Sequence, residues 1–257
     1  MNASLVHDVI AQTDTGLVRS HNEDSLVISL QDRLVIVADG MGGYQAGEVA
    51  SKMAADIITA EIGSRLALRA SDMGQGLDKG LLRSAIEVAN LAVYQSAQSQ
   101  AAHAGMGTTV VVGLFDQQRL TVAHLGDSRL YRLRALQLKR ITRDHSLLQE
   151  QIDSGLISAH EAMRAPNKNL VTRALGIDPT VDPEIFDYQT EEGDLYLFCT
   201  DGLTDMVPDQ DIEMTLQALG SNLRLCAQHL IANANDNGGR DNITVVLVRI
   251  NRNRSTA

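Results

Sequence analysis

The sequence predicts an α+β fold in which two antiparallel sheets pack together with helices outside. Short apolar runs rich in β-branched residues alternate with turn residues along most of the chain, which is typical of hairpin-connected strands. Two pairs of segments instead carry apolar residues at three- and four-residue spacing, which predicts two helix pairs. Sheets in contact, each covered by a helix pair, would bury both kinds of apolar face.

Size and composition indicate one acidic globular domain. The chain has 257 residues and no internal repeat or linker, so we expect a domain over residues 1–250 and a disordered tail over 251–257. Lys and Arg number 22 against 32 Asp and Glu, a formal charge of −10. This balance and the absence of tryptophan argue against nucleic-acid binding. The acidic excess suits a protein that gathers carboxylates around cations.

The sequence also predicts a cytoplasmic protein, which we expect to be monomeric. Met1–Ile10 has no Lys or Arg and no long apolar core, so no secretory signal is expected there. No apolar run approaches the ~18 residues that a membrane span needs. The cysteines, Cys199 and Cys226, lack metal-ligand spacing and are expected to be core thiols.

The first half of the chain predicts strands, then a helix pair, then strands again. The initial strands are followed by a helix that begins at about Gly47 and by a second amphipathic helix with Leu82, Ile86 and Val93 on one face. The β pattern resumes at Gly107. These elements are expected at residues 6–12, 26–30, 34–38, 47–68, 82–97, 107–115, 120–125, 130–134 and 138–142.

The second half begins with a break in the β pattern. Residues 144–176 are polar and hold only short helices, so they look like an excursion from the scaffold, and such excursions often flank sites. Two strands around the turn 191–194 follow, then a helix pair and a last strand. These elements are expected at residues 184–189, 195–200, 209–219, 223–234 and 243–250.

Asp39 stands where the apolar strand 34–38 meets a glycine-rich turn, Gly40-Met-Gly-Gly43. Asp-Gly is a common hairpin signal, but here a helix follows instead of a partner strand. A P-loop would need Lys where Glu48 stands, and the dinucleotide fingerprint would need Gly at Gln45. We therefore interpret Asp39 as a cation ligand.

Similar acidic positions recur along the chain. Asp127 follows Gly126, Asp201 precedes Gly202, and Asp241 follows Gly239-Arg240. A polar cluster, Arg19–Asp24, comes directly before the hairpin that contains Asp39; it is either a solvated loop or a site with Arg19 for phosphate and Glu23 and Asp24 for metal or water. All these ligands are oxygens, which favours Mg²⁺ or Mn²⁺ over Zn²⁺. His124, inside a strand, is expected to be a core histidine.

Five motifs in chain order carry a resemblance to a known family. They are Arg19-Ser-His-Asn-Glu-Asp24, Asp39-Gly-Met-Gly-Gly43 with Gly47-Glu48, Gly126-Asp-Ser-Arg129, Thr200-Asp-Gly202 and Gly239-Arg-Asp-Asn242. Together they resemble the metal-dependent Ser/Thr protein phosphatases of the PPM or type 2C family, and Met41 is common in its bacterial branch. The resemblance covers residues 6–250.

The resemblance implies a four-layer α-β-β-α sandwich with a binuclear metal site at one edge. Asp39 would bridge both ions, and residues 144–176 would form a mobile flap beside them. The implied site comprises Glu23 and the carbonyl of Gly40 on one metal, Asp201 and Asp241 on the other, Asp127 with Asp201 on a third, weaker one, Asp24 orienting a metal-bound water, and Arg19 gripping phosphate.

The implied reaction is direct hydrolysis of phosphoserine or phosphothreonine in proteins, without a covalent enzyme intermediate. Two metals would make hydroxide available near neutral pH, and Arg19 would neutralise charge on the phosphoryl oxygens. The expected partners are phosphorylated proteins and a bacterial Ser/Thr kinase whose action the enzyme reverses. Two alternatives stay open: a non-catalytic relative that binds phosphoproteins, and a phosphatase for a small phosphoester.

Two departures from the family pattern affect the leaving-group proton. Relatives commonly have histidine where this chain has Tyr44, and eukaryotic relatives often have histidine where Met41 stands. A metal-bound water is therefore our first choice of donor, with His21 and Tyr44 as further candidates.

Overall fold

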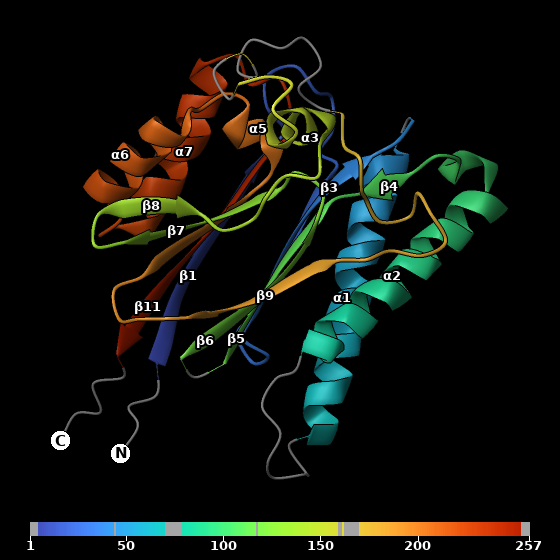
Figure 1. Ribbon diagram of the computed structural model, residues 1–257, viewed down its shortest axis with the longest axis horizontal. Coiled ribbons are helices and arrows are strands. Elements are labelled where there is room, and N and C mark those ends of the chain that lie inside the picture. Colours follow the sequence, from blue (N-terminus) through green and yellow to red (C-terminus); the bar gives the residue numbers. More distant parts are fainter. Residues whose placement is uncertain are drawn as a thin grey trace.

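The computed structural model describes residues 5–43, 45–69, 79–116, 118–158, 161 and 170–252. Two antiparallel sheets face one another, and a helix pair covers the outer face of each (Figure 1). The predicted fold class and the four-layer arrangement are therefore confirmed. Tyr44, residues 162–169 of the expected flap and residues 253–257 of the expected tail lie outside the described residues.

Each sheet consists of antiparallel strands only. The first contains, in spatial order, β1 (Leu5–Asp14), β11 (Ile243–Arg252), β10 (Leu195–Cys199), β7 (Arg129–Arg134) and β8 (Gln137–Arg140). The second contains β2 (Asp24–Ser29), β3 (Leu34–Met41), β5 (Val110–Asp116), β6 (Arg119–Leu125) and β9 (Glu184–Gln189), with β4 (Gly107–Thr108) paired to the end of β3.

The helices lie on the outside of the sandwich (Figure 1). The first pair is α1 (Ala46–Arg69) and α2 (Lys79–Ser99), and the second is α6 (Asp209–Leu219) and α7 (Leu223–Asp236). Shorter helices are η1 (Ala101–His103), α3 (Leu147–Asp153) and α5 (Asp201–Thr204). Helix ends follow local rules: Asn222 caps α7 by accepting a hydrogen bond from the backbone N–H of Leu225 at 3.2 Å.

Three apolar layers hold the sandwich together. One lies between α1, α2 and the second sheet, one between α6, α7 and the first sheet, and one between the two sheets. Tyr196 and Phe198 of β10 and Val246 of β11 belong to the inter-sheet layer and are fully buried. Burying such side chains stabilises the fold by about 1.5–3 kcal/mol each.

Strand alternation carries acidic side chains into the space between the sheets. In β3, Val37 belongs to the inter-sheet layer, and Asp39, two residues further, lies on the same face of the strand. In β2, Leu26 packs against the same layer, and Asp24 stands opposite Asp39 in the register. Thr244 of β11 has the same parity as Val246. The inter-sheet core therefore ends at one edge in polar groups.

Two expected boundaries were wrong. The predicted strand 107–115 is interrupted at Thr109, so β4 pairs with β3 alone while β5 joins the sheet. The two strands expected around the turn 191–194 are present, but they lie in different sheets, because β9 pairs with β6 and β10 pairs with β7 and β11. The expected tail begins too early: Asn251 and Arg252 belong to β11, since they pair with Val6 and Leu5 of β1.

The segment after β8 has the short helical structure that its sequence predicts. Ser146 caps α3, its hydroxyl accepting a hydrogen bond from the backbone N–H of Gln149 at 3.3 Å, and Gly155 follows the helix with φ +74°. Ser158 and Glu161 exchange the hydrogen bonds of the predicted capping box. Helix α3 is at the same end of the sandwich as α5 (Figure 1), and the N–H of His145 just before it donates to the carbonyl of Gly126 at the end of β6.

Candidate metal centre

The loop between β1 and β2 is fixed against the start of β11. Its turn at Gly16 has φ +78°, and the Asp14 carboxylate accepts a hydrogen bond from the Gly16 N–H at 2.8 Å. The backbone N–H groups of Leu17 and Val18 both donate to the carbonyl of Gly239, at 2.7 and 3.2 Å. This anchoring places Arg19 beside Asp241, although the two are far apart in the sequence.

Arg19 pairs directly with Asp241. Its Nη2 lies 2.6 Å from Asp241 Oδ2, and the side chains are 48% and 27% exposed. This hydrogen bond raises the pKa of Arg19 above its ordinary value, and the charges of Glu23 and Asp39 act in the same direction. The guanidinium therefore stands at the open side of an acidic group and is accessible to a phosphate.

Glu23 is held by its backbone against the ends of β3 and β11. Its N–H donates to Asn242 Oδ1 at 2.7 Å, and its carbonyl accepts from the N–H of Gly40 at 3.1 Å. A Cβ on Gly40 would lie 2.0 Å from the carbonyl oxygen of Gly47, and one on Gly47 would lie 2.8 Å from the Glu23 carboxyl. Only glycine fits at either position, so the carboxylate of Glu23 lies directly against this turn.

Asp24 is positioned by two threonine hydroxyls. Its Oδ2 accepts hydrogen bonds from Thr200 Oγ1 at 2.9 Å and from Thr244 Oγ1 at 2.7 Å. Its Oδ1 is buried and makes no hydrogen bond within the described residues, and the same is true of Glu23 Oε1. Burial raises the pKa of Asp24 to about 7, because water no longer stabilises the charge.

Asp39 and Asp201 form the buried centre of the group. Burial raises the pKa of Asp39 well above its ordinary value, and repulsion by Asp24, Asp201, Asp127 and Asp241 adds to this effect. Burial likewise raises the pKa of Asp201, with further repulsion by Asp127. These mutual effects require the carboxylates to lie close together, which sequence spacing alone did not establish.

Asp127 joins the group from the turn between β6 and β7. It is 7% exposed, and burial, followed by repulsion from Asp144, raises its pKa to about 6. Asp205 also repels both Asp127 and Asp201, so it faces the same place. Asp205 is not among the site residues predicted from the sequence. Its position four residues after Asp201, which puts both on one face of a helix, is the signal that could have identified it.

This arrangement fits divalent cations. Several carboxylates share one partly buried edge, and burial and mutual repulsion raise the pKa values of Asp24 and Asp39, so their charged forms are disfavoured unless cations neutralise them. One buried oxygen each of Glu23 and Asp24 makes no hydrogen bond within the described residues. An all-oxygen donor set of this kind is the one that Mg²⁺ and Mn²⁺ prefer.

A second group, His124, His145 and Glu184, has donor atoms within 4.8 Å of one another but does not fit a metal. The imidazole rings stack at 4.8 Å with an interplanar angle of 14°. A metal lies in the plane of an imidazole along a nitrogen lone pair, and two nearly parallel rings cannot both satisfy this for one ion. As expected, His124 is a core histidine, whose Nε2 donates to the Arg143 carbonyl at 2.9 Å.

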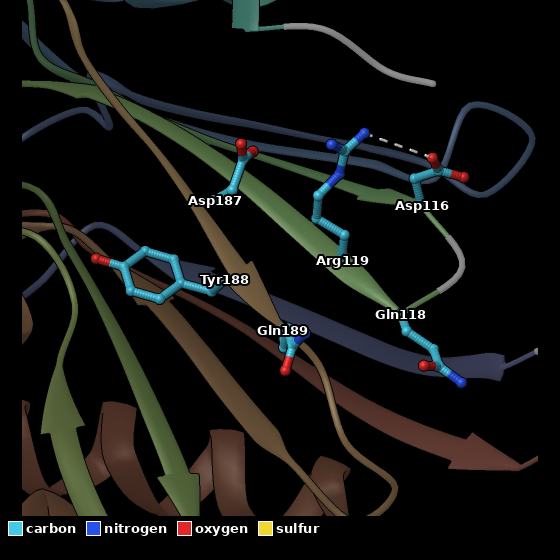
Figure 2. Close-up of a pocket in the computed structure, with 6 residues that line it drawn as sticks. All are labelled: Asp116, Gln118, Arg119, Asp187, Tyr188 and Gln189. Carbon is cyan, nitrogen blue, oxygen red and sulfur yellow. Dashed lines mark ion pairs between the residues drawn. The ribbon is translucent and has the colours of Figure 1, made fainter. Parts of the chain in front are cut away.

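A hollow at the other end of β5 and β6 also differs from the acidic centre (Figure 2). Arg119 there pairs with Asp116 at 3.7 Å, while Asp187, on β9, lies 3.6 Å from Lys79. Its carboxylates are therefore already neutralised by side-chain cations, unlike those around Asp39.

The candidate proton donors differ in their placement. His21 Nε2 lies 3.4 Å from Glu23 Oε1, its side chain is 39% exposed, and its Nδ1 lies 3.0 Å from the hydroxyl of Ser20. His21 is therefore at the rim of the centre. Met41, at the position where eukaryotic relatives often have histidine, is the last residue of β3. Tyr44 lies outside the described residues.

Comparison with known proteins agrees with the geometry. A family model described as protein phosphatase 2C matches residues 12–243. The chain belongs to this family. The family predicted from the five motifs is thereby confirmed, and in this chain those motifs supply the carboxylates that lie around Asp39.

Relatives support the same assignment. The chain is similar to the serine/threonine phosphatase stp of Listeria monocytogenes, 40% identical over 240 residues that cover 92% of this chain and 93% of the relative. The crystal structure of the Mycobacterium tuberculosis serine/threonine phosphatase PstP/Ppp matches with a TM-score of 0.85 and 37% identity, covering 96% of this chain and 99% of that one. A structure of the PstP catalytic domain in complex with two manganese ions matches with a TM-score of 0.82 and 37% identity, covering 96% and 100%.

These likenesses confirm a phosphatase of the protein phosphatase 2C family, and the two manganese ions of the PstP catalytic domain agree with the all-oxygen donor set of this chain. The roles of the individual carboxylates remain predictions. Within the part of the chain that the structure describes, no helix combines the length and apolar character needed to cross a bilayer.

Replacing Asp39 should separate stability from metal binding. We expect Asp39→Asn to raise the melting temperature in chelator by a few degrees, because one buried charge is removed from a repelling group. The same variant should lose most of the stabilisation that Mn²⁺ gives the unmodified protein. Asp56→Asn, at a side chain 63% exposed on α1, is the control and should change neither value. A lower melting temperature in chelator with full Mn²⁺ stabilisation would contradict the assignment of Asp39.

The metal-free protein should become less stable as pH rises. The pKa values of Asp127 and Asp24 are raised to about 6 and about 7, against roughly 3.9 in an unfolded chain. The stability that these protonated carboxyl groups contribute is fully present below their pKa in the unfolded chain. It is lost as pH rises through their pKa values in the folded protein. In chelator, the melting temperature should fall by about 5 °C or more between pH 5.5 and 8, and the gain on adding Mn²⁺ should be larger at pH 8. A rise over this range in chelator would refute the prediction.

Proposed function

We propose that the protein removes phosphate from phosphoserine and phosphothreonine residues of proteins by direct hydrolysis at a two-metal centre. The observation that carries this proposal is the convergence of buried carboxylates around Asp39, with an exposed Arg19 at their open side. The chain matches these relatives over most of its length, and the phosphatase activity in their names supports the proposal.

The carboxylates suggest how two ions would be held. Asp39, central in the group, would bridge them. Glu23 and the carbonyl of Gly40, which are in contact through the backbone, would hold one ion; Asp201 and Asp241 would hold the other. Asp127, with Asp201 and Asp205, would hold a third, weaker ion. When bound, the cations lower the pKa of a water molecule so that hydroxide is available near neutral pH.

The remaining polar groups orient the reaction. The two threonine hydroxyls leave Asp24 one free carboxylate oxygen, Oδ1, to accept a hydrogen bond from the attacking water. Arg19 can offer two parallel N–H groups to the phosphoryl oxygens and stabilise their charge in the transition state. The proton that the leaving hydroxyl needs would come from a water held beside Asp127, and His21, at the open rim, is a further candidate.

A covalent cysteine mechanism does not fit this chain. Both thiols are fully buried, in the layer between α6, α7 and the first sheet. Burial raises the pKa of Cys199 far above its ordinary value and that of Cys226 to about 11, so neither is a thiolate near neutral pH. The burial of both thiols supports water as the nucleophile.

The surface around Arg19 favours a protein substrate over a small phosphoester. Leu17 and Val18, adjacent to Arg19, are each 69% exposed and held rigidly by the carbonyl of Gly239. An open, partly apolar rim suits the chain on either side of a phosphorylated residue, whereas a small ester would favour an enclosed pocket. A non-catalytic role in binding phosphoproteins would not require the complete group of carboxylates.

The partners are part of this proposal. We expect the substrates to be proteins phosphorylated by a bacterial Ser/Thr kinase, and we expect the enzyme to act as a monomer in the cytoplasm. Phosphoproteomes of cells with and without the enzyme would identify these substrates.

Activity should depend on added metal and on a peptide context. Protein stripped of metal should release no phosphate from a phosphothreonine peptide, and Mn²⁺ or Mg²⁺ should restore release because hydroxide forms only at the loaded centre. Free phosphothreonine should be a poorer substrate by kcat/KM. Undiminished activity in excess chelator would refute the mechanism, and a preference for small phosphorylated metabolites would favour the small-ester alternative.

Arg19→Ala should lower kcat/KM for a phosphothreonine peptide about ten- to a hundredfold, the range for a charged hydrogen bond to phosphate. A rise in KM would indicate that Arg19 binds phosphate equally in the ground and transition states; a fall in kcat would indicate a transition-state contact. Arg83→Ala is the matched control, since Arg83 is 43% exposed and pairs with Asp182. Equal kinetics for both variants would exclude Arg19 from the site.

A further inference from the structure

His145 occupies a junction beside the acidic centre. It follows Asp144 at the start of the segment that precedes α3, and its side chain is 5% exposed. Neither the motifs nor the proposed mechanism gives it a role. Its contacts nevertheless reach the turn that carries Asp127, strand β9 and the far end of the same segment.

The turn before Asp127 is held by His145 through two hydrogen bonds. The backbone N–H of Gly126 donates to His145 Nδ1 at 3.2 Å, and the N–H of His145 donates to the Gly126 carbonyl at 2.9 Å. Gly126 has φ +102°, and a Cβ there would lie 2.5 Å from Thr109. Gly126, the residue before Asp127, therefore has a backbone conformation that favours glycine. Its buried N–H uses the His145 imidazole as its hydrogen-bond acceptor.

The imidazole is itself held in one tautomer and one orientation. Its Nε2 lies 3.1 Å from Glu184 Oε1, so Nε2 carries the proton and Nδ1 has a free lone pair. The ring stacks on His124, which is fixed by the Arg143 carbonyl. Burial lowers the pKa of His145 below its ordinary value, which keeps the ring neutral, as an acceptor must be.

The backbone of His145 also ties down the other end of the segment. Its carbonyl accepts a hydrogen bond from the N–H of Thr172 at 2.8 Å, and Ser146 forms a bridge with Val171. One residue thus joins the Asp127 turn to both ends of the segment 144–176.

We propose that His145 is a positioning residue whose Nδ1 fixes the Gly126 peptide and thereby aims the Asp127 carboxylate at a divalent cation. The inference rests on the proposed role of Asp127 as a cation ligand. It goes beyond that role, because it makes a non-ligand in the segment 144–176 a determinant of cation binding at the weakest site.

Two substitutions separate the functions of the two ring nitrogens. In His145→Asn, the side-chain oxygen takes the place of Nδ1 and still accepts from Gly126; in His145→Gln, the amide nitrogen takes the place of Nε2 and keeps the contact with Glu184. If His145 only packed in the core, both substitutions should weaken binding of the ion to a similar extent, or Asn more because its side chain is smaller. Positioning through Nδ1 predicts that Asn is tolerated and Gln is not.

The decisive readout is the number of Mn²⁺ ions bound at millimolar concentration, counted by electron paramagnetic resonance on the full chain. We expect unmodified protein and His145→Asn to bind an ion beyond the two tight ones, and His145→Gln and Asp127→Ala to lack it. Turnover of a phosphothreonine peptide should fall roughly tenfold or more in the latter two, less than the roughly hundredfold or more typical of a side chain that transfers the proton itself. The fall should be smaller with p-nitrophenyl phosphate, whose leaving group needs little protonation.

The outcomes separate this inference from its premise. If Asp127→Ala lacks the weak ion while His145→Gln keeps it, the positioning role is overturned and the role of Asp127 stands. If Asp127→Ala binds like unmodified protein, both are overturned. Equal loss in His145→Asn and His145→Gln also overturns positioning. Should His145→Gln not fold, Glu184→Ala, which releases the tautomer, should weaken the same ion, and unchanged binding would overturn the inference.

Discussion

The crowding of buried carboxylates at one edge of the sandwich is the constraint on which the rest of the structure depends. Burial and mutual repulsion raise the pKa values of Asp24, Asp39, Asp127 and Asp201, so the protein stores unfavourable electrostatic free energy where it works. Divalent cations relieve that repulsion and gain their affinity from it. Stability, metal binding and catalysis are therefore coupled through one group of side chains, as expected when an active site opposes the stability of its fold.

The scaffold supports this crowding by fixing each carboxylate from outside the group. Two apolar sheets present polar ends to the gap between them, and threonine hydroxyls from β10 and β11 hold Asp24. The contact between Gly40 and Gly47 brings α1 against β3, while Asn242 accepts from the Glu23 N–H and donates to the carbonyls of Thr15 and His21. These groups are rigid because strands or short turns carry them, which is what a preorganised site requires.

The sequence predicted the site residues that a local motif marks. It missed those whose role depends on contacts between segments far apart in the chain. Asp39, Asp127 and Asp201 were recognisable because each interrupts an apolar strand beside glycine, and the helix pairs because their apolar spacing is regular. Asp205 and His145 gave no such signal, since their importance depends on which elements meet in space. The sequence predicted the strands β9 and β10 but not that they lie in different sheets, because alternation identifies a strand but not its sheet.

Anomalous diffraction at the manganese edge, from crystals grown with Mn²⁺, would locate the bound ions. We expect two strong peaks with the Asp39 carboxylate between them, one beside Glu23 and the Gly40 carbonyl and the other beside Asp201 and Asp241. A peak between His124, His145 and Glu184, with none at Asp39, would contradict it.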